Sequence, residues 1–299
     1  MIPTIMSKWM SLVSIVLLVG VSLRFRSVNG LSMGYYLMSC PFVDPIVKNT
    51  VNRALQNDPT LAASLIRMHF HDCFVEGCDG SILIDSTRDN TAEKDSPANL
   101  SLRGYEVIDE IKEQLERQCP GGPFYEIPKG RKDGTRSRIE DTVNLPSPFL
   151  NASQLINTFA QRGFTPQQMV ALSGAHTLGV ARCISFKGRL DGNDPLLSPN
   201  FGRALSRTCS NGDNALQTFD ATPDSFDNVY YNALSRGAGV LFSDQTLFAS
   251  PRTRDIVTAY AMNQALFFLD FQRAITKMGL LDVKEGYRGQ VRRNCRRVN

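Results

Sequence analysis

The sequence has almost no strand-like alternation, no internal repeat, no low-complexity linker and no long apolar run beyond its N-terminus. The scarcity of strand patterns indicates a mostly α-helical protein. The absence of a second apolar run predicts a soluble mature chain without a membrane span. Strong charge is also absent: the net charge is +4, and the basic residues are scattered except for a cluster at 292–297. We therefore do not expect nucleic-acid binding.

The one apolar run lies near the N-terminus, from Leu12 to Leu23, behind Lys8 and ahead of small residues that lead to Gly30. It is too short to cross a bilayer and has the layout of a secretory signal peptide. We therefore predict a signal peptide at residues 1–30 and a secreted mature chain at residues 31–299.

Cysteines are present in an odd number after this segment. The seven are Cys40, Cys73, Cys78, Cys119, Cys183, Cys209 and Cys295. A secreted protein usually pairs its cysteines, so an odd count leaves one thiol over.

Capping residues and apolar spacing predict the helices. A capping side chain precedes a proline at three places, which marks three helix starts: Asp44-Pro45, Asp58-Pro59 and Thr165-Pro166. Apolar stripes predict further helices over 107–115 and from 155 to a stop at Gly163, and one or two long helices from 256 to Gly279. The stretch from 120 to 149 is the least helical.

The segment LAASLIRMHFHDCF places Arg67 and His71 four residues apart, on one face of a helix. A histidine that exchanges protons beside a fixed cation suits cleavage of a polar bond that leaves an anion. A surface arginine with a buried structural histidine would show the same spacing, so the pair alone does not distinguish a catalytic site from a structural one.

The next residues, DCFVEGCDGSILID, are rich in oxygen ligands. Side chains of Asp72, Asp79 and Ser81, with carbonyls of Val75 and Gly77, suit calcium, and an acidic turn without an ion is the alternative.

Two cysteines flank this loop and could close it as a short disulfide. A zinc site built from His69, His71, Cys73 and Cys78 is the other option, and a secreted setting favours the disulfide.

The run RMHFHDCFVEGCDGSILID resembles the distal signature of the class III secretory plant peroxidases. The resemblance implies an all-α fold in which two helical halves sandwich one haem b. It assigns His71 as the distal base, Arg67 as the distal arginine, Phe70 as the aromatic residue at the haem edge and Asn99 as the hydrogen-bond partner of His71. The implied distal calcium ligands are Asp72, Val75, Gly77, Asp79 and Ser81, with Glu93 acting through water.

Asn99 also begins a glycosylation sequon, but the implied role requires it to be buried and unmodified. Asn151 is then the expected glycan site.

A second motif, MVALSGAHTLGVARC, contains His176, one of only three histidines in the chain. A single histidine near a helix end is more often structural than a ligand. LSGAHT, however, resembles the proximal signature of the same family, which implies that His176 is the axial ligand of haem iron. The pattern GVLFSDQ implies that Asp244 accepts a hydrogen bond from His176.

The resemblance also implies a second calcium site and a donor channel. The second set of calcium ligands is Thr177, Asp220, Thr222, the carbonyl of Ser225, and Asp227. Pro146, in NLPSPF, matches the proline that lines the access channel for aromatic donors.

The resemblance covers nearly all of residues 31–299, with one break between Pro120 and Gly121. About twenty residues of the family pattern, including a VSCAD motif and a core helix of the distal half, are absent there. The implied disulfides are Cys40–Cys119, Cys73–Cys78 and Cys183–Cys209, and Cys295 loses its family partner. A splice variant or a gene-model error would explain the break. The lost helix and disulfide together would remove free energy comparable to the whole stability of a typical domain.

The implied function is reduction of hydrogen peroxide with one-electron oxidation of phenolic donors. The implied protein is a monomer of the apoplast or cell wall with one haem b and two calcium ions, and its mild positive charge could hold it loosely on wall polysaccharide. Two alternatives stay open: a haem-deficient, inactive wall-associated relative or splice product, and a calcium- or zinc-dependent structural domain.

Overall fold

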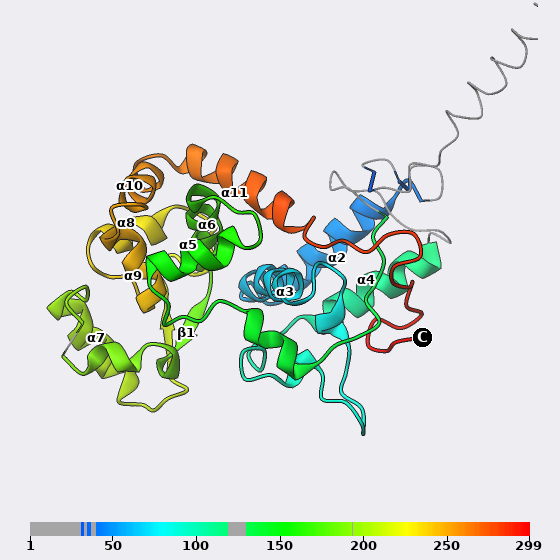
Figure 1. The fold of residues 1–299 in the computed structure, drawn as a ribbon, viewed down its shortest axis with the longest axis horizontal. Coiled ribbons are helices and arrows are strands. Elements are labelled where there is room, and N and C mark those ends of the chain that lie inside the picture. The colour runs from blue at the N-terminus through cyan, green and yellow to red at the C-terminus, as the bar shows by residue number, and fades with distance from the viewer. Residues whose placement is uncertain (1–30, 33–34, 37–39, 119–129, 193) are drawn as a thin grey trace, which may run out of the picture.

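The computed structural model describes residues 31–32, 35–36, 40–118, 130–192 and 194–299. Within these ranges the chain is mostly helical, with one small sheet, which confirms the predicted fold class (Figure 1). No helix in the described ranges is long and apolar enough to cross a membrane. The predicted signal peptide at 1–30 and the break between Pro120 and Gly121 lie outside the described residues and stay predictions.

We call residues 40–118, 130–144 and 282–299 the distal half. Its helices and 3-10 helices are α2 (Val43–Asn57), α3 (Leu61–Val75), η1 (Ser81–Leu83), η2 (Glu93–Asp95), α4 (Tyr105–Gln118) and η3 (Ile139–Asn144). Helix α2 packs on α4, and α3 runs through the middle of the molecule between this pair and the other half (Figure 1).

We call residues 145–281 the proximal half. Its elements are α5 (Ala152–Ala160), α6 (Pro166–Ser173), η4 (Gly174–Thr177), β1 (Val180–Arg182), η5 (Cys183–Ser185), η6 (Lys187–Leu190), α7 (Pro199–Cys209), β2 (Leu216–Thr218), α8 (Val229–Ser235), α9 (Phe242–Ala249), α10 (Arg254–Met262) and α11 (Gln264–Met278). Helix α11 packs lengthwise on α6, and α10 packs on α8 and α9. The antiparallel pair β1–β2, in which Val180 pairs with Thr218, has no counterpart in the helical pattern of the sequence.

The predicted helix ends agree with the structure where the capping chemistry is complete. Thr165 caps α6 in a full capping box with Gln168, directly before the proline at the first helical position. The long C-terminal pattern forms two helices, and the second is capped at Gly279. Helix α3 instead begins at Leu61, because Asp58 accepts a hydrogen bond from the backbone of Thr60 and so delays the start.

The largest core cluster belongs to the proximal half, where residues of α5, α6, α8, α10 and α11 surround fully buried Phe267 and Leu247. The C-terminal end of α3 joins this cluster through Cys73 and Phe74. The distal half holds two small clusters, one around Met68 and Ile82 and one around Cys40 and Val43. Helix α3 is thus anchored mainly in the proximal core.

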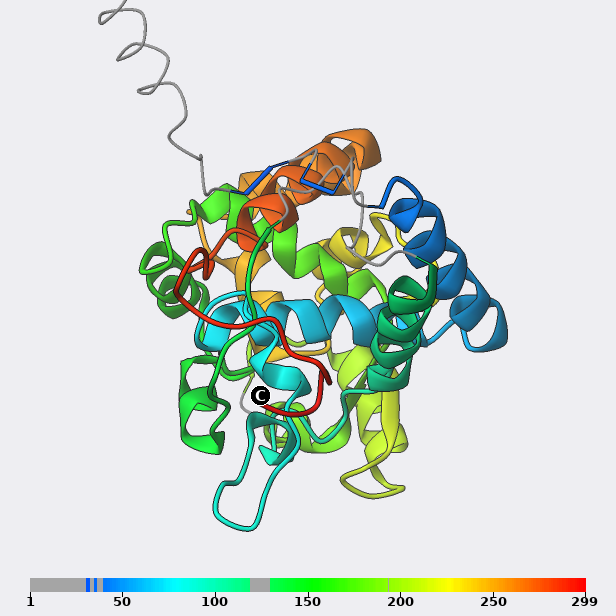
Figure 2. The same cartoon turned by 90° about the vertical axis from the view of Figure 1, so that its right-hand side faces the viewer.

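The C-terminal segment crosses the outside of the distal half (Figure 2). Its backbone bridges to residues 132–133 through Lys284 and Gln290, and its own Arg292 is buried, 2% exposed. This segment therefore fastens the C-terminus to the rest of the distal half.

Two of the implied disulfides are present, Cys73–Cys78 and Cys183–Cys209, the second joining η5 to the end of α7. Cys295 is a free, half-buried thiol, as the resemblance implies. Cys119 lies outside the described residues, so its pairing with Cys40 stays a prediction.

Candidate active site

His71 lies in the last turns of α3 and is 6% exposed. Its Nδ1 lies 2.5 Å from Oδ1 of Asn99, and its Nε2 lies 3.1 Å from Nε of Arg67. The amide oxygen of Asn99 and the guanidinium N–H have fixed roles as acceptor and donor, so the two contacts specify one tautomer. Nδ1 carries the proton and Nε2 keeps the lone pair.

Asn99 is held in place by the turn between η2 and α4. It is 1% exposed, and its Nδ2 donates to the carbonyl oxygen of Glu93 at 2.7 Å. That bond fixes the orientation of the amide, so the oxygen faces His71. The buried position agrees with the expectation that Asn99 carries no glycan, whereas Asn151 is exposed at the N-terminus of α5.

Arg67 sits one turn before His71 and is tied at both ends of its guanidinium. Nη1 donates to Oγ of Ser101 at 2.7 Å, and Nη2 donates to the carbonyl of Ala98 at 2.6 Å. Both partners come from the same turn that positions Asn99. One turn of the chain therefore orients the base and the cation together.

Burial, followed by the positive charge of Arg67, lowers the pKa of His71 to about 3, although the bond to Asn99 acts in the opposite direction. The imidazole is therefore neutral at any pH near 7. A neutral imidazole with a fixed Nε2 lone pair is able to accept a proton.

Phe70 is half-buried on α3 and stacks against Phe159 with ring centroids 6.2 Å apart. It also contacts Phe74, at 4.4 Å, and lies edge-on to His71. This packing couples the face of α3 that carries His71 to α5.

His176 lies in η4, the short helix that follows α6, and η4 contacts α3. Its Nδ1 donates to Oδ1 of Asp244 at 2.8 Å, and Phe219 stacks on the imidazole almost in parallel, with centroids 4.5 Å apart. Because Nδ1 is engaged, Nε2 is the nitrogen that can ligate a metal. The contact between α3 and η4 brings the elements that carry His71 and His176 to the same region of the molecule.

Asp244 is 2% exposed in the first turn of α9. Its Oδ1 accepts a second hydrogen bond, from the hydroxyl of Tyr230 at 3.0 Å. A buried carboxylate that holds the far nitrogen of an imidazole is a common partner of metal-ligating histidines. The donor set of His176 and Asp244 therefore fits the axial side of haem.

The oxygen-rich loop after α3 gathers the implied distal calcium ligands. Asp72 accepts backbone hydrogen bonds from Gly80 and Ile82, and Asp79 accepts one from Ser81. Gly77 turns the loop with φ +96°, where an added Cβ would lie 2.6 Å from Cβ of Asp282. A residue with a side chain would not fit there.

The loop has the chemistry of a cation site. Both carboxylate oxygens of Glu93 and Oγ of Ser81 are buried without a hydrogen-bond partner among the described residues. Burial raises the pKa of Glu93 to about 8 and that of Asp72 to about 7, and the neighbouring carboxylates add to both shifts. Buried, mutually repelling carboxylates of this kind are stabilised by a bound cation, so the residues fit calcium.

One cation of the chain already reaches this loop. Lys284 forms an ion pair with Asp79, which is almost fully buried, and donates to the carbonyl of Glu76 at 3.1 Å. No local pattern predicts this contact, because the two residues are far apart in the chain.

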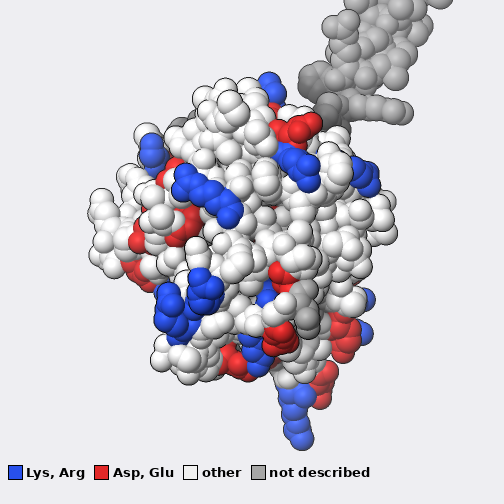
Figure 3. Space-filling model, turned by 90° about the vertical axis from the view of Figure 1, so that its left-hand side faces the viewer, with Lys and Arg blue, Asp and Glu red and all other residues white. Residues whose placement is uncertain are grey.

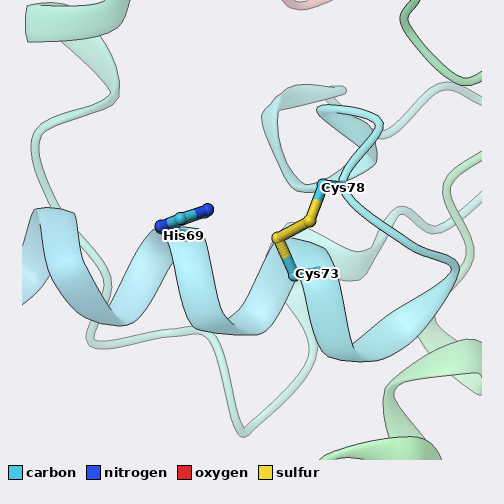
Figure 4. A group of neighbouring side chains, drawn as sticks. All are labelled: His69, Cys73 and Cys78. Atoms are coloured by element: carbon cyan, nitrogen blue, oxygen red, sulfur yellow. A yellow bond between two sulfur atoms is a disulfide. The ribbon is translucent and has the colours of Figure 1, made fainter. Parts of the chain in front are cut away.

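The zinc alternative for this region has no support in the structure. The ligand atoms of His69, Cys73 and Cys78 lie within 4.8 Å of one another, but the two sulfurs are bonded to each other (Figure 4). His71 is engaged by Asn99 and Arg67 instead. The disulfide interpretation is therefore the one that the structure supports.

The implied second calcium set also converges. Thr177 is fully buried, and its hydroxyl oxygen lies within hydrogen-bond distance of two carboxylates, 2.7 Å from Oδ2 of Asp220 and 3.0 Å from Oδ1 of Asp227. Thr222 donates its backbone N–H to Asp220, and Ser225 follows in the same turn. Burial raises the pKa of Asp220, which again marks a place where a cation would relieve charge.

Three further residues complete the comparison of the expected site with the observed one. Pro146 is half-buried in the loop between η3 and α5. Tyr230 and Phe219, both in contact with the His176–Asp244 pair, were not predicted. Their only sequence signal is position, since Phe219 begins the FDATPDSFDN segment and Tyr230 follows it by two residues.

The arrangement as a whole is that of a helical peroxidase: a base beside a fixed arginine on one element, and a carboxylate-bound histidine on the facing one. A family model described as Peroxidase matches this chain at residues 47–122 and 120–263. Peroxidase 47 of Arabidopsis thaliana is 64% identical over 310 residues, which cover 97% of this chain and 95% of that protein. Peroxidase 66 and Peroxidase 64 of the same plant are each 44% identical, over 295 and 300 residues, covering 89% and 91% of this chain and 91% and 94% of theirs.

The chain therefore belongs to the class III plant peroxidases. The two matched segments of the family model meet at 120–122, where the sequence predicts the break. The alignment with Peroxidase 47 is 310 residues long, longer than the 299-residue chain, so that relative has residues with no counterpart here.

Proposed function

We propose that this chain reduces hydrogen peroxide at one haem b bound through His176 and takes the electrons one at a time from phenolic donors. The haem, when bound, supplies the redox chemistry. The observation that carries the proposal is the geometry at His71, whose tautomer and neutral state are set by Asn99, Arg67 and burial.

His71 acts as the proton carrier. Nε2 would take the proton from the inner oxygen of the peroxide and return it to the outer oxygen, which leaves as water. The bound haem would supply the two electrons that cleavage of the O–O bond requires. The low pKa of His71 keeps Nε2 deprotonated before the step, and the Asn99 bond keeps the other proton on Nδ1 throughout.

Arg67 stabilises the negative charge that develops on the outer oxygen as the O–O bond breaks. Its bonds to Ser101 and Ala98 hold the guanidinium in place before the reaction. A preorganised cation needs little rearrangement in the transition state, which is why it lowers the barrier.

His176 would hold the iron through Nε2, with Asp244 and Phe219 fixing the plane of the imidazole. Two calcium ions would bind at the oxygen clusters around Asp72 and Thr177. The distal cluster adjoins η2, whose Glu93 also holds Asn99, so a cation there would stiffen the turn that orients His71.

Phenolic donors would approach near Pro146. Secretion to the apoplast or wall as a monomer is part of the same proposal and rests on the N-terminal segment and the family. On the face shown in Figure 3, basic side chains are dispersed among acidic and neutral ones, which suits loose contact with polysaccharide more than a dedicated nucleic-acid surface.

The test starts from residues 31–299 folded with haem and calcium. We expect a Soret band that shifts when hydrogen peroxide is added and returns when guaiacol is added. His71→Leu should slow the reaction with peroxide by about 10²–10⁴-fold.

The matched control is His69→Gln, two residues away and outside the His71 network, which should react at nearly the unmodified rate. A folded chain without a Soret band would contradict the proposal and favour the haem-deficient relative. Equal rates for His71→Leu and His69→Gln would contradict the role of His71.

A further inference from the structure

Tyr230 makes an interaction that the proposed chemistry does not use. It lies in α8, is 1% exposed, and its hydroxyl donates to Oδ1 of Asp244 at 3.0 Å. The same oxygen accepts the Nδ1–H of His176 at 2.8 Å. The other oxygen, Oδ2, is buried without a hydrogen-bond partner among the described residues. Two donors therefore converge on one carboxylate oxygen while the second oxygen has none.

The phenol is the donor in this pair. Burial and the charge of Asp244 raise the pKa of Tyr230 well above its usual value, so the hydroxyl keeps its proton. The ring also lies edge-on to His176, with centroids 6.1 Å apart and planes at 81°. The side chain thus supports the His176–Asp244 pair both by its hydroxyl and by its ring.

Two hydrogen bonds to one oxygen compete for its electron density. The charge that the tyrosine hydroxyl draws is no longer available to the Nδ1–H of the imidazole. Hydrogen bonds to charged groups are among the stronger ones in proteins. Removing one donor should therefore strengthen the remaining bond measurably.

We propose that Tyr230 is a positioning residue for the proximal pair, which limits how far Asp244 can polarise His176 and so sets the ligand strength of the imidazole. The proposal rests on the proposed role of His176 as the axial ligand. A less polarised imidazole donates less charge to bound iron, and the oxidised state of the iron is then less favoured. Loss of the tyrosine hydroxyl should therefore shift the iron toward its oxidised form.

The chain offers a matched control in the next residue. Tyr231 is also fully buried and packs against Tyr230 with centroids 5.0 Å apart. Its hydroxyl, however, donates to the carbonyl of Val170 at 2.8 Å and does not reach Asp244. Tyr231→Phe removes the same atom from the same core without touching the carboxylate.

The experiment compares Tyr230→Phe and Tyr231→Phe in the haem-loaded protein. The midpoint potential is measured by spectroelectrochemical titration, and the iron–imidazole stretch by resonance Raman spectroscopy. We expect Tyr230→Phe to shift the equilibrium toward oxidised iron by about three- to tenfold, where tenfold equals 59 mV for one electron, and to raise the stretching frequency. Tyr231→Phe should change neither.

A second measurement needs no haem. In the haem-free protein, the Nδ1 proton of His176 should move downfield in the NMR spectrum of Tyr230→Phe and stay in place in Tyr231→Phe. Equal shifts, or no shifts, in the two variants would overturn the role of Tyr230 and would leave the ligation by His176 standing. Absence of an iron–imidazole band in the unmodified, haem-loaded chain would instead overturn the ligation by His176, and with it this proposal.

Discussion

The two halves of the molecule differ in how they bury apolar and polar groups. The proximal half contains the largest cluster, in which Phe267 packs edge to face with Tyr231 and at a tilt against Tyr260. It also holds a second cluster around the fully buried Phe186 and Leu205. The distal half has two small clusters, and in it the side chains of Ser81, Glu93, Tyr105 and Arg292 have buried polar atoms without hydrogen-bond partners among the described residues. The sequence predicts that the distal half lacks a core helix of the family pattern, and smaller apolar clusters are the expected result. Unpartnered buried polar atoms occur in both halves, since Nη2 of Arg189 and Oδ2 of Asp244 also lack partners among the described residues.

The difference matters for catalysis because the proposed base and its arginine lie in the distal half. Helix α3 is nevertheless anchored at its C-terminal end in the proximal core, through Cys73 and Phe74. His71 is near that end, and Arg67 is one turn further from it. We therefore expect Arg67 and His71 to be positioned more rigidly than the rest of the distal half.

The largest expected effect comes from restoring the missing segment. Inserting the corresponding residues of Arabidopsis Peroxidase 47 between Pro120 and Gly121 should raise the free energy of unfolding by about 5 kcal/mol or more, since it adds core contacts and a partner for Cys295. Chemical denaturation measures the gain. A second insertion variant, in which serine replaces the inserted cysteine, separates the contribution of the disulfide to stability from that of the packing. If neither variant has a higher free energy of unfolding, the distal half needs no additional helix.

Truncation of one core residue in each half should destabilise the protein by different amounts. Leu247 and Ile82 are both buried aliphatic residues, at 0% and 1% exposure, in the large and a small cluster. Leu247→Ala should cost about 5 kcal/mol and Ile82→Ala about 2 kcal/mol, because a loosely packed site collapses more easily around a cavity. Urea unfolding gives both values. Equal costs would mean that the two halves are equally well packed.

Calcium removal should destabilise the protein by an amount that depends on pH, because the carboxylates of the distal loop then lose their cation. The folded pKa values of Asp72 and Glu93, about 7 and about 8, lie above their usual values of 3.8 and 4.5. Their contribution to the stability of the calcium-free protein is therefore fully present below about pH 4 and is lost as the pH rises through 7 and 8. The rise in Tm on adding calcium should be larger at pH 8 than at pH 5.

Glu93→Gln should flatten that pH dependence, while the exposed neighbour Glu76→Gln should leave it unchanged. Thermal unfolding with calcium and with a chelator gives the comparison. His71 contributes with the opposite sign, since its lowered pKa costs stability as the pH falls from 6.5 towards 3, but this contribution is common to both variants. Matching slopes in the two variants would contradict the cation assignment of Glu93.

The smallest effect is expected at Cys295. Burial raises the pKa of this thiol, so it should react slowly with a disulfide reagent, and Cys295→Ser should change the free energy of unfolding by less than about 1 kcal/mol. Breaking the Cys183–Cys209 bond with Cys183→Ser should cost about 2–5 kcal/mol. A cost at Cys295 that equals the cost at Cys183 would show that Cys295 is bonded in the folded protein.

Much of the fold and site could be read from local patterns. The capping box at Thr165, the stop at Gly279 and the spacing of Arg67 and His71 depend on residues within one or two turns, so the sequence predicts them well. The start of α3 was misplaced by two residues because the side chain of Asp58 bonds the backbone ahead of the helix. The sheet was missed because three-residue strands are too short to show alternation.

Sequence patterns alone identify the residues available for chemistry, the cysteines that flank each loop and the place where the family pattern is broken. The folded chain adds that Asn99 fixes the tautomer of His71, that Lys284 reaches Asp79, and that Tyr230 shares the oxygen of Asp244 with His176. These contacts join residues from separate elements across the fold. Local periodicity carries no information about them, because they form only when packed elements bring distant segments within hydrogen-bond distance.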